Sequence, residues 1–562
     1  MGFAFPADTP TSLRRDFVVA PSSGSDAPRG VDPTRSDELE KPEPSRANLR
    51  QAVDAAKRRF GELMEALVTE AASPVEPKDL LDLEAELHRT VARDCVDPVV
   101  GAVIQDLHNG DEIRIRATVL RLNRPHMHLQ KSNQRVAITL LGGSKVDVLS
   151  PYYLSRPPRR RGRPRTKKGR KKAQGNGLYP VLAVLGLRFR MSPALVSEVA
   201  RLVALSTIEQ AADTLARRGV QLDRKVIRRI AITIAEGGLS YRDWLEQRTQ
   251  DGARGHHAKG KRLVIGSDGG RVRIRYPKKR GRRRKTGRKG YDGQWKEPKV
   301  LVVYEVDETG RKVRGGLCRY DATMRDANGF FTVLTALLRE IGAHEAKEWI
   351  IVGDGANWIW DRIPGLIEAL DFDPEKVTQV VDFYHAVQRL HEIAAECSSW
   401  SNGDRKKWVR RMKRLLRRDR VDELLEQRTQ LFNGRNSKKR RKLFDYFVDR
   451  ADKMRYFTFR KRGVPLGSGA VESCVRRVVN LRLKGNGIFW NLDTAEGVLH
   501  LRAQLLCGRW DDFIHTVLRP QEVWSLGGSD PYEVNRGAAL AAIERGDQRS
   551  RDSESEVERK TA

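Results

Sequence analysis

The sequence predicts an α/β protein whose core is a mixed β-sheet flanked by helices. After residue 260, three strand-like segments are followed by alternating helical and strand-like segments, which is typical of such a sheet. A helical segment at 386–466 then separates this core from a short return at 467–515, and the periodicity before residue 250 is mainly helical. The chain has 562 residues, too many for one ordinary core, so several packed units are expected.

Composition narrows the classes of function. The chain has 106 Lys and Arg against 73 Asp and Glu, a net charge of +33, which indicates a polyanionic partner. No stretch approaches 18 consecutive apolar residues and no Walker A string occurs, so we expect neither a membrane span nor ATP binding, and the location is predicted to be cytoplasmic. The cysteines are scattered without a zinc-like or disulfide-like spacing, and stand at Cys95, Cys318, Cys397, Cys474 and Cys507.

The ends of the chain and the first region set the outer boundaries. Residues 1–46 and 516–562 are poor in core-forming residues and are predicted to be a disordered N-terminal tail and a C-terminal tail. Between them, 47–150 is predicted to be helical up to about residue 107 and short-stranded from 111, through EIRIRATVL and RVAITLL with its GG turn. The residues suggest no function for this region.

A linker rich in proline and arginine is predicted at 151–180. It contains RRRGRPR, with Arg161, Arg163 and Arg165, and its Arg-Gly-Arg-Pro resembles the centre of AT-hook motifs, in which arginines enter an A·T minor groove. A linker that contacts phosphates without sequence preference is the equal alternative. Both alternatives place DNA at this segment.

Residues 181–250 are predicted to form a domain like a helix-turn-helix. Two helical segments within 206–235 are joined at Gly219, which suits a turn. The second would be a recognition helix with Arg224, Lys225, Arg228 and Arg229 directed at DNA. A plain helical hairpin produces the same pattern, so that alternative stays open.

The predicted core begins with residues 262–385. Strand patterns in RLVIGSDGG, EPKVLVVYEV and RKVRGGLCRY precede a helix, a strand at 349–352, another helix and a strand at 377–381. The basic segment 277–296 is too polar for the core, so we expect a projecting loop that grips DNA through Arg282, Arg283 and Arg284. A purely solvated loop is the alternative.

Two aspartates end strands of this core. Asp268 closes the first strand and Asp354 follows the fourth, so adjacent placement of these strands would bring the two carboxylates together. Each is followed by glycine, which permits a sharp turn and leaves the carboxylate open. Hard divalent cations prefer such oxygen ligands, and the geometry suits phosphoryl transfer. Taken singly, either aspartate is more often an ordinary turn residue.

A third carboxylate, Glu472, lies on a helix that follows Gly-Ser-Gly. At α-helical spacing Glu472, Arg476 and Asn480 would share one face, so that Arg476 could hold a DNA phosphate beside bound metal. A solvated helix face is equally compatible with the arginine. Asp354 follows Asp268 by 86 residues, and Glu472 follows Asp354 by 118 because the helical segment intervenes.

This ordered D…D…E set resembles the DDE transposases with an RNase H-like core, in particular the mutator-like group of bacterial insertion sequences. The resemblance covers roughly 262–515 and extends to an all-helical insertion, here 386–466, and to a D-x-x-H-like signature, here Asp382-Phe383-Tyr384-His385. His385 read alone is as compatible with an ordinary buried histidine.

The resemblance implies a function. Asp268, Asp354 and Glu472 would be the catalytic and metal-binding residues, holding two Mg²⁺ or Mn²⁺ ions ~4 Å apart for DNA strand cleavage and joining. Asp382, His385 and Arg476 would be neighbours of the site. The partners would be double-stranded DNA, namely the element's terminal repeats and its target, and a second copy in a dimer or higher synaptic oligomer. The place of action would be a bacterial cytoplasm, at the nucleoid.

Two other functions remain open from the sequence. One is an RNase H-like nuclease that only hydrolyses, which would need no reader of terminal repeats. The other is a domesticated DNA-binding protein that retains the fold without catalysis. Carboxylate geometry discriminates between an active and an inactive site.

Overall fold

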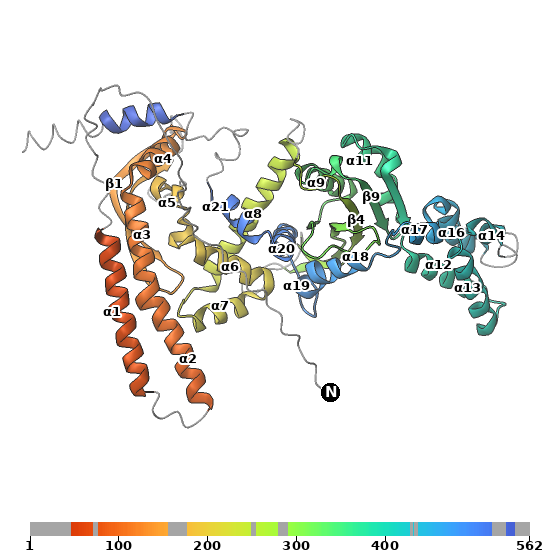
Figure 1. Cartoon of the computed structure of the whole chain (residues 1–562), viewed down its shortest axis with the longest axis horizontal. Coiled ribbons are helices and arrows are strands. Elements are labelled where there is room, and N and C mark those ends of the chain that lie inside the picture. Colours follow the sequence, from red (N-terminus) through yellow and green to blue (C-terminus); the bar gives the residue numbers. More distant parts are fainter. Residues whose placement is uncertain are drawn as a thin grey trace, which may run out of the picture. The chain divides into compact units, whose positions relative to one another are not determined.

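The computed structural model describes residues 47–70, 77–155, 177–248, 255–278, 290–427, 431, 437–519 and 535–545, all within one unit that spans 46–562. It has mixed α/β architecture, with a five-stranded sheet whose strands run both parallel and antiparallel, as predicted (Figure 1). No helix among these residues is long and apolar enough to cross a membrane. The predicted disordered N-terminal tail, 1–46, lies outside the described residues.

The N-terminal region is helical and then forms a small sheet. Its helices are α1 (Ala47–Glu70), α2 (Pro77–Val91), the π-helical turn η1 (Ala92–Val96), α3 (Asp97–Asn109) and α4 (Asp111–Leu122). The strands β1 (Met127–Thr139), β2 (Lys145–Ser155) and β3 (Gly177–Leu178) then pair antiparallel in that order. Strand β2 extends five residues into the predicted linker, of which 156–176 lies outside the described residues.

The expectation of a strand at EIRIRATVL was wrong, because these residues form α4. Their short alternation of apolar and polar positions resembles a strand, but other signals favour a helix. Asp111 and Glu112 stand in the first turn, where the helix dipole favours acids, and Arg116 donates to Glu112 one turn earlier at 2.7 Å. Ile115, with Val119 one turn later, is buried, which is helical spacing.

The predicted DNA-reading region forms a helical group with its own apolar core. It comprises α5 (Pro180–Val184), the 3-10 turn η2 (Arg188–Arg190), α6 (Pro193–Leu205), α7 (Ile208–Arg217) and α8 (Arg224–Arg248). Its core also contains Leu501, Trp510, Phe513 and Val517, from helices near the other end of the sequence. The region predicted at 181–250 therefore shares its core with later residues.

The five-stranded sheet has the order β10-β9-β4-β7-β8. Strands β4, β7 and β8 form an antiparallel meander, whereas β9 and β10 run parallel to β4. Helix α9 contacts β7, and α18 contacts β4 and β7. The strands are β4 (Arg262–Gly269), β7 (Lys299–Val306), β8 (Cys318–Thr323), β9 (Glu348–Gly353) and β10 (Val377–Val381).

Between β4 and β7 the chain forms a separate two-stranded hairpin rather than the predicted loop. Its strands are β5 (Val272–Pro277) and β6 (Tyr291–Lys296), and they pair along their whole length. Pairing over 291–296 was missed because every residue of β6 is exposed, so no apolar alternation marks the strand. Residues 279–289, with Arg282, Arg283 and Arg284, lie outside the described residues.

Helices connect the later strands, and a further helical group follows β10 as predicted for 386–466. The connecting elements are α9 (Ala327–Glu340), η4 (Ala343–Glu345), α10 (Asn357–Trp360), α11 (Ile363–Ala369) and η5 (Pro374–Lys376). The group after β10 comprises α12 (Phe383–Ala395), α13 (Asn402–Leu416), α14 (Val421–Glu426), α16 (Ser437–Val448), η6 (Ala451–Lys453) and α17 (Tyr456–Lys461).

The chain then returns to the sheet and to the N-terminal helices. The last elements are α18 (Gly469–Cys474), the π-helical turn η7 (Val475–Asn480), α19 (Leu481–Leu483), α20 (Leu492–Leu506) and α21 (Trp510–Leu518). The prediction of a tail from residue 516 was wrong in part, because Val517 and Leu518 are buried in α21 and residues 536–545 are helical. Ala539 of this last helix packs against Ile115 and Val119 of α4.

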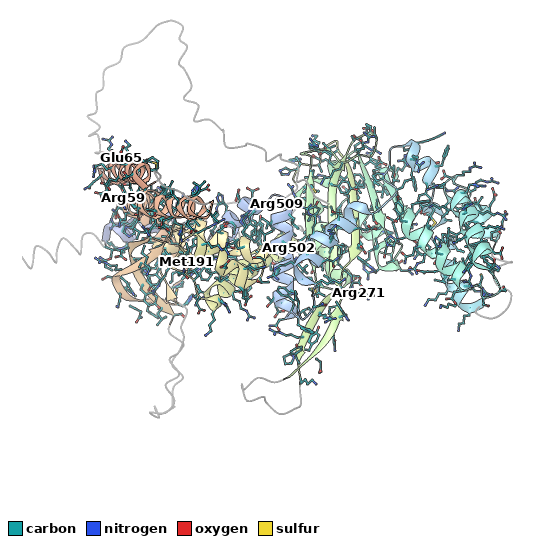
Figure 2. The ribbon with its side chains drawn as sticks, turned by 90° about the horizontal axis from the view of Figure 1, so that it is seen from below. Arg59, Glu65, Met191, Arg271, Arg502 and Arg509 are labelled. Carbon is teal, nitrogen blue, oxygen red and sulfur yellow. The ribbon has the colours of Figure 1, made fainter. Side chains whose placement is uncertain are left out.

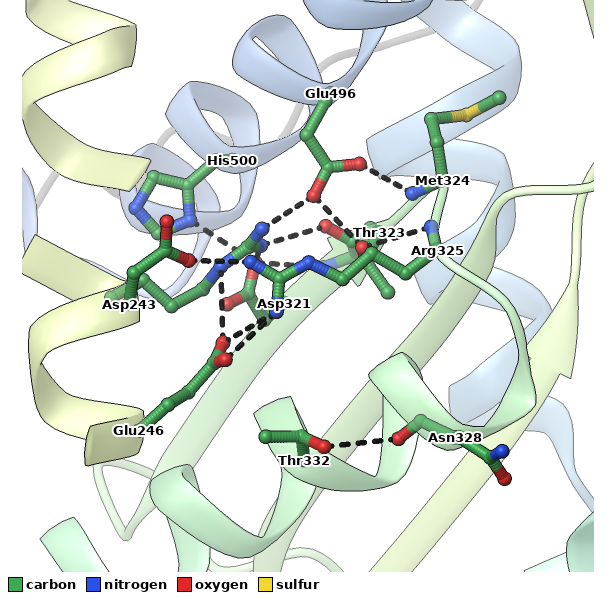
Figure 3. A network of polar contacts seen from close by, with 12 residues as sticks. Asp243, Glu246, Asp321, Thr323, Met324, Arg325, Asn328, Thr332, Glu496 and His500 are labelled. Atoms are coloured by element: carbon green, nitrogen blue, oxygen red, sulfur yellow. Dashed lines mark hydrogen bonds and ion pairs between the residues drawn. The ribbon is translucent and has the colours of Figure 1, made fainter. Parts of the chain in front are cut away.

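A buried polar network joins α8, β8 and α20 (Figure 3). Arg242 of α8 is 5% exposed, pairs with Glu496 of α20 and lies 3.6 Å from a carboxylate oxygen of Asp321 in β8. His500 Nδ1 lies 3.2 Å from the same aspartate. Thr323 of β8 donates to Glu496 at 2.8 Å. The helical group and the sheet are thus joined by charged side chains that are buried together.

Candidate active site

Asp268 occupies the end of the central strand β4. Residues 262–267 are all buried, whereas Asp268 is half-buried, because the strand leaves the sheet interior at this point. The backbone N–H of Gly269 donates to Asp268 Oδ1 at 2.6 Å, which orients the carboxylate. A Cβ added at Gly270, two residues after Asp268, would lie 3.1 Å from Val479 Cγ1 of η7. The return segment of the chain therefore borders this aspartate.

Asp354 lies beside it because β4 and β9 are parallel neighbours. The register runs as far as Gly266 paired with Val352, and each aspartate follows two residues later, near enough for the charge of Asp354 to raise the pKa of Asp268. The N–H of Ala356 donates to Asp354 Oδ1 at 2.9 Å. The adjacency on which the sequence argument depended is thus present in the sheet.

The turn after Asp354 has a specific support. Gly355 has φ +87°, a conformation that glycine adopts without strain, and a Cβ there would meet the ring of Tyr446 at 2.4 Å. The hydroxyl of Tyr446, from α16, donates to the Asp354 carbonyl oxygen at 3.0 Å. The helical segment between the two parts of the core therefore contacts the backbone of a candidate catalytic residue.

Glu472 is carried to the same face of the sheet by α18. A Cβ on Gly266 would lie 2.3 Å from Val471 Cγ2, so the absence of a side chain at Gly266 lets the helix seat directly on β4. Asp268 is two residues after Gly266 and faces the same side, because side chains alternate along a strand. Glu472 follows Val471 and is exposed, while Val471 is buried.

The electrostatics place these carboxylates within reach of one another. The pKa of Asp268 is raised to about 6, chiefly by burial and also by the charges of Asp354 and Glu472. The Gly269 hydrogen bond and His385 act in the opposite direction. A raised pKa at a strand end beside other acids is the property expected of a site that gains from a cation.

Asp382 and His385 form a second pair next to this site. Asp382 is 1% exposed and caps α12 by accepting from the His385 N–H at 2.9 Å, and its other oxygen accepts from the Ser468 N–H. Burial opposes ionisation, but these hydrogen bonds hold the pKa of Asp382 well below its usual range. His385 Nδ1 lies 3.4 Å from Asp382 Oδ1. The pair joins α12 to the loop before α18.

His385 lies near three acids, Asp382, Asp354 and Asp268. Asp382 raises the pKa of His385, burial lowers it, and the charges of Asp354 and Asp268 raise it again. The imidazole side chain is 32% exposed. The arrangement brings the D-x-x-H residues together with the carboxylates at one end of the sheet.

Arg476 lies on η7, where the helix is π rather than α. The predicted common face of Glu472, Arg476 and Asn480 assumed α-helical spacing, and that assumption was wrong, because i→i+5 hydrogen bonds widen the turn from Val475 to Asn480. Arg476 is exposed. No sequence signal marks the change of pitch, because the segment VRRVVN is compatible with either helix.

The carboxylate oxygens of Asp268 and Asp354 are chemically suitable ligands for a hard cation. Within the described part of the chain, one oxygen of Asp268 and one of Asp354 accept backbone N–H groups while the second oxygens accept no hydrogen bond. Carboxylate oxygens of this kind are ligands for Mg²⁺, which takes one or two of them with water. Among the described residues, however, no three His, Cys, Asp or Glu side chains are gathered closely enough to hold an ion together.

The predicted recognition helix is the first part of α8. Arg224, Lys225, Arg228 and Arg229 are all exposed, while Ile227 is buried between them. Helix α7 begins with a capping box at Thr207 and Gln210, and Gly219 in the following turn has φ +86°. The arrangement presents a basic helix start to solvent. Arg161, Arg163 and Arg165 lie outside the described residues.

The β5–β6 hairpin combines basic and aromatic side chains. It follows Arg271, which Figure 2 labels near its base. The guanidinium of Arg273 lies 4.7 Å from the ring centroid of Trp295 and 5.6 Å from that of Phe489. Trp295 is 53% exposed. Cationic and aromatic groups in alternation are typical of surfaces that contact nucleic acid.

Sequence reasoning missed Tyr446 and gave Ser468 no role. Tyr446 lies 92 residues after Asp354 in a helical segment without a motif, so only the fold brings it to the turn. Ser468 was visible as the middle of Gly-Ser-Gly before α18, and its buried Oγ has no hydrogen-bond partner within the described part of the chain. Its backbone, rather than its hydroxyl, ties α18 to Asp382.

Comparisons with protein-family models, with curated proteins and with solved structures found no match to this chain.

Proposed function

We propose that this protein is a DDE-type DNA transposase with an RNase H-like core, which cleaves the ends of a bacterial insertion sequence and joins them to target DNA. The observation that carries the proposal is the parallel pairing of β4 with β9, whose register ends two residues before Asp268 and Asp354. The seating of α18, with Glu472, on the same face of β4 adds the third acid.

The carboxylates provide the chemistry that a divalent cation needs. Asp268 and Asp354 would hold Mg²⁺ or Mn²⁺ through their second oxygens, with Glu472 completing a two-ion site. When bound, the ions would supply Lewis-acid stabilisation of charge at the attacking and leaving oxygens of a phosphodiester. Positive charge at this place would also relieve the repulsion that raises the pKa of Asp268.

The surrounding residues orient these groups. The N–H groups of Gly269 and Ala356 fix the two aspartates, and Tyr446 holds the Asp354 turn. His385, kept protonated more readily by Asp382, would place a positive charge beside a DNA phosphate. The exposed basic residues of α8 and the β5–β6 hairpin would contact the terminal repeats and flanking DNA.

A non-catalytic DNA-binding protein is the second candidate. The observation that favours it is that, within the described residues, no three potential ligands gather closely enough for a metal. In the transposase proposal, DNA and cations together draw Glu472 toward the aspartates. The two candidates therefore differ in whether cations and the three acids matter for strand cleavage.

The test is a cleavage and joining assay with duplex DNA that carries the element's ends, with Mg²⁺ or Mn²⁺. The unaltered chain is compared with Asp354→Asn, which preserves shape and weakens metal binding. The matched control is Asp361→Asn, the same substitution at an exposed aspartate one helix further on. We expect cleavage and joining by the unaltered chain and by Asp361→Asn, and loss of at least ~100-fold in rate for Asp354→Asn.

Three other results would each contradict the transposase proposal. Cleavage without joining would favour a hydrolytic nuclease. Equal cleavage by the Asp354→Asn chain would remove the carboxylate site from the chemistry. DNA binding without cleavage in all three proteins, over a range of cation concentrations, would favour the non-catalytic protein.

A further inference from the structure

The helices α1, α2, η1 and α3, residues 47–109, form a helical arm with little core of its own. Among the described side chains from Asn48 to Asp94, none is buried. The arm is anchored at α3, where buried Asp97 accepts the N–H groups of Gly142 at 3.1 Å and Ser144 at 2.9 Å from the β1–β2 turn. Most of the stability of a helix in a protein comes from tertiary packing, yet no described side chain of α1 or α2 is buried.

An exposed apolar stripe runs along the arm. Val96, Val100, Val103 and Leu107 follow one another at spacings of four, three and four residues, and are 53%, 38%, 37% and 50% exposed. This is the spacing of a helix face that packs against another helix. Three more large apolar side chains of the arm are exposed, namely Phe60, Leu80 and Leu81. An exposed apolar stripe at helical spacing is typical of a protein-binding site.

The charge of the arm excludes DNA as the occupant. Residues 47–109 contain seven Lys and Arg against twelve Asp and Glu, a net charge of −5 in a chain whose total is +33. An acidic surface repels a polyanion, whereas the basic residues of α8 and the hairpin attract it. The stripe therefore suits a protein helix better than DNA.

The charge order along α1 identifies a second copy of this chain as that protein. The first half of α1 carries Arg50, Lys57 and Arg58 with one acid, Asp54, and its second half carries Glu62 and Glu65 with one base, Arg59 (Arg59 and Glu65 are labelled in Figure 2). Two such helices side by side in opposite directions set the basic half of each against the acidic half of the other. A twofold interface requires a surface that complements itself in this way.

We propose that the helical arm is a dimerisation surface, on which the arms of two copies pack in opposite directions through the α3 stripe and the charged halves of α1. The arm is distant in sequence from the candidate carboxylates, and its association requires neither DNA nor metal. The proposal goes beyond the proposed function and holds or fails independently of it.

The first test measures the mass of the full-length protein in solution, by sedimentation and by light scattering, without DNA or divalent cations. We expect a dimer for the unaltered chain and for the Asp354→Asn variant. Val100→Glu with Val103→Glu should raise the dimer dissociation constant at least ~100-fold, since charges would enter an apolar contact. The control is Gln105→Glu, which adds a charge to an exposed position of the same helix outside the stripe.

Circular dichroism would establish that each variant is folded. A monomeric unaltered chain at tens of micromolar, or a stripe variant that is folded and still dimeric, would overturn the proposal. A dimer that forms only when DNA is added would also overturn it, because DNA would then supply the contact.

A charge exchange tests the antiparallel direction. A chain with Lys57→Glu and Arg58→Glu and a second chain with Glu62→Lys and Glu65→Lys should each associate ~10-fold more weakly with itself than the unaltered chain. An equal mixture of the two should restore association, as a heterodimer detected with one chain tagged. Failure of the mixture to associate more tightly than either variant alone would contradict the antiparallel arrangement.

Discussion

Asp268 shows how a single carboxylate links stability to the proposed chemistry. Its pKa of about 6 in the folded chain exceeds the unfolded value near 3.9, so the folded state binds more protons between those pH values. The free energy of unfolding therefore falls as pH rises through about 4 to 6, and stays lower above that window. Ionisation of Asp268 lowers the free energy of unfolding, and a bound cation would offset that loss.

Replacement of this carboxylate should stabilise the protein without metal. We expect Asp268→Asn to raise the free energy of unfolding by about 2 kcal/mol at pH 7.5, because it removes a charge that burial, and then the charges of Asp354 and Glu472, disfavour. At pH 4.5 the gain should fall to about a third, because Asp268 is then protonated in the folded chain but still largely ionised in the unfolded chain. Urea unfolding at both pH values, in chelator, measures this. An equal gain at both would contradict the role of ionisation.

Tyr446 is a positioning residue in the same site. Tyr446→Phe removes the hydroxyl that donates to the Asp354 carbonyl and leaves the ring that packs on Gly355. We expect the cation concentration for half-maximal cleavage to rise at least ~10-fold, with a smaller change in rate at saturating cation. Tyr304→Phe, at a buried tyrosine of β7, is the control. A lower rate with an unchanged cation requirement would indicate a merely structural role.

The sequence could predict the aspartates but not their supports. Asp268 and Asp354 stand after apolar runs and before glycine, a local pattern that can be read without a fold. Tyr446 and the Ser468 N–H reach the site only through packing between segments about 90 residues apart, and no local pattern records such contacts. Arg476 was assigned from a helical period that the π-turn does not keep.

At the scale of elements, the contact of α18 with β4 determines where Glu472 lies. Gly266→Ala would place a Cβ 2.3 Å from Val471 Cγ2, so α18 must move away from the sheet. We expect a loss of about 1–3 kcal/mol in stability and a marked loss of cleavage. The double variant Gly266→Ala with Val471→Ala should regain most of both, because the added and removed methyl groups occupy the same space. Thermal unfolding and the cleavage assay measure the pair, and additive losses would contradict the contact.

Elements with strong apolar signals were predicted, and those without them were not. The buried strands β4, β7 and β9 read as continuous apolar runs, which is why their order along the chain was clear. Strand β6 has no buried residue, and α4 has apolar positions that match both a strand and a helix over eight residues. Pairing with β5 defines β6, and packing of Ile115 and Val119 supports the helix at α4.

At the scale of the whole molecule, Arg242 joins the helical group to the sheet. Arg242→Met would leave Asp321 and Glu496 buried with less compensating charge. We expect a loss of about 3–5 kcal/mol in stability, which is typical when one partner of a buried ion pair is removed. Arg325→Met, whose side chain is 33% exposed, should cost less. Chemical unfolding of both variants measures this, and equal small losses would contradict the proposed importance of burial.

The core shared by α6, α8, α20 and α21 also has a consequence during synthesis. Trp510, Phe513 and Val517 close the same apolar cluster as Leu195 and Ile230, although about 300 residues separate them. Until the ribosome has made α20 and α21, those side chains are missing, so the apolar cluster against which α8 packs is incomplete. Under the proposed function, a truncated product would therefore lack a complete DNA-reading domain, and only a nearly complete chain would compete for the ends of the element.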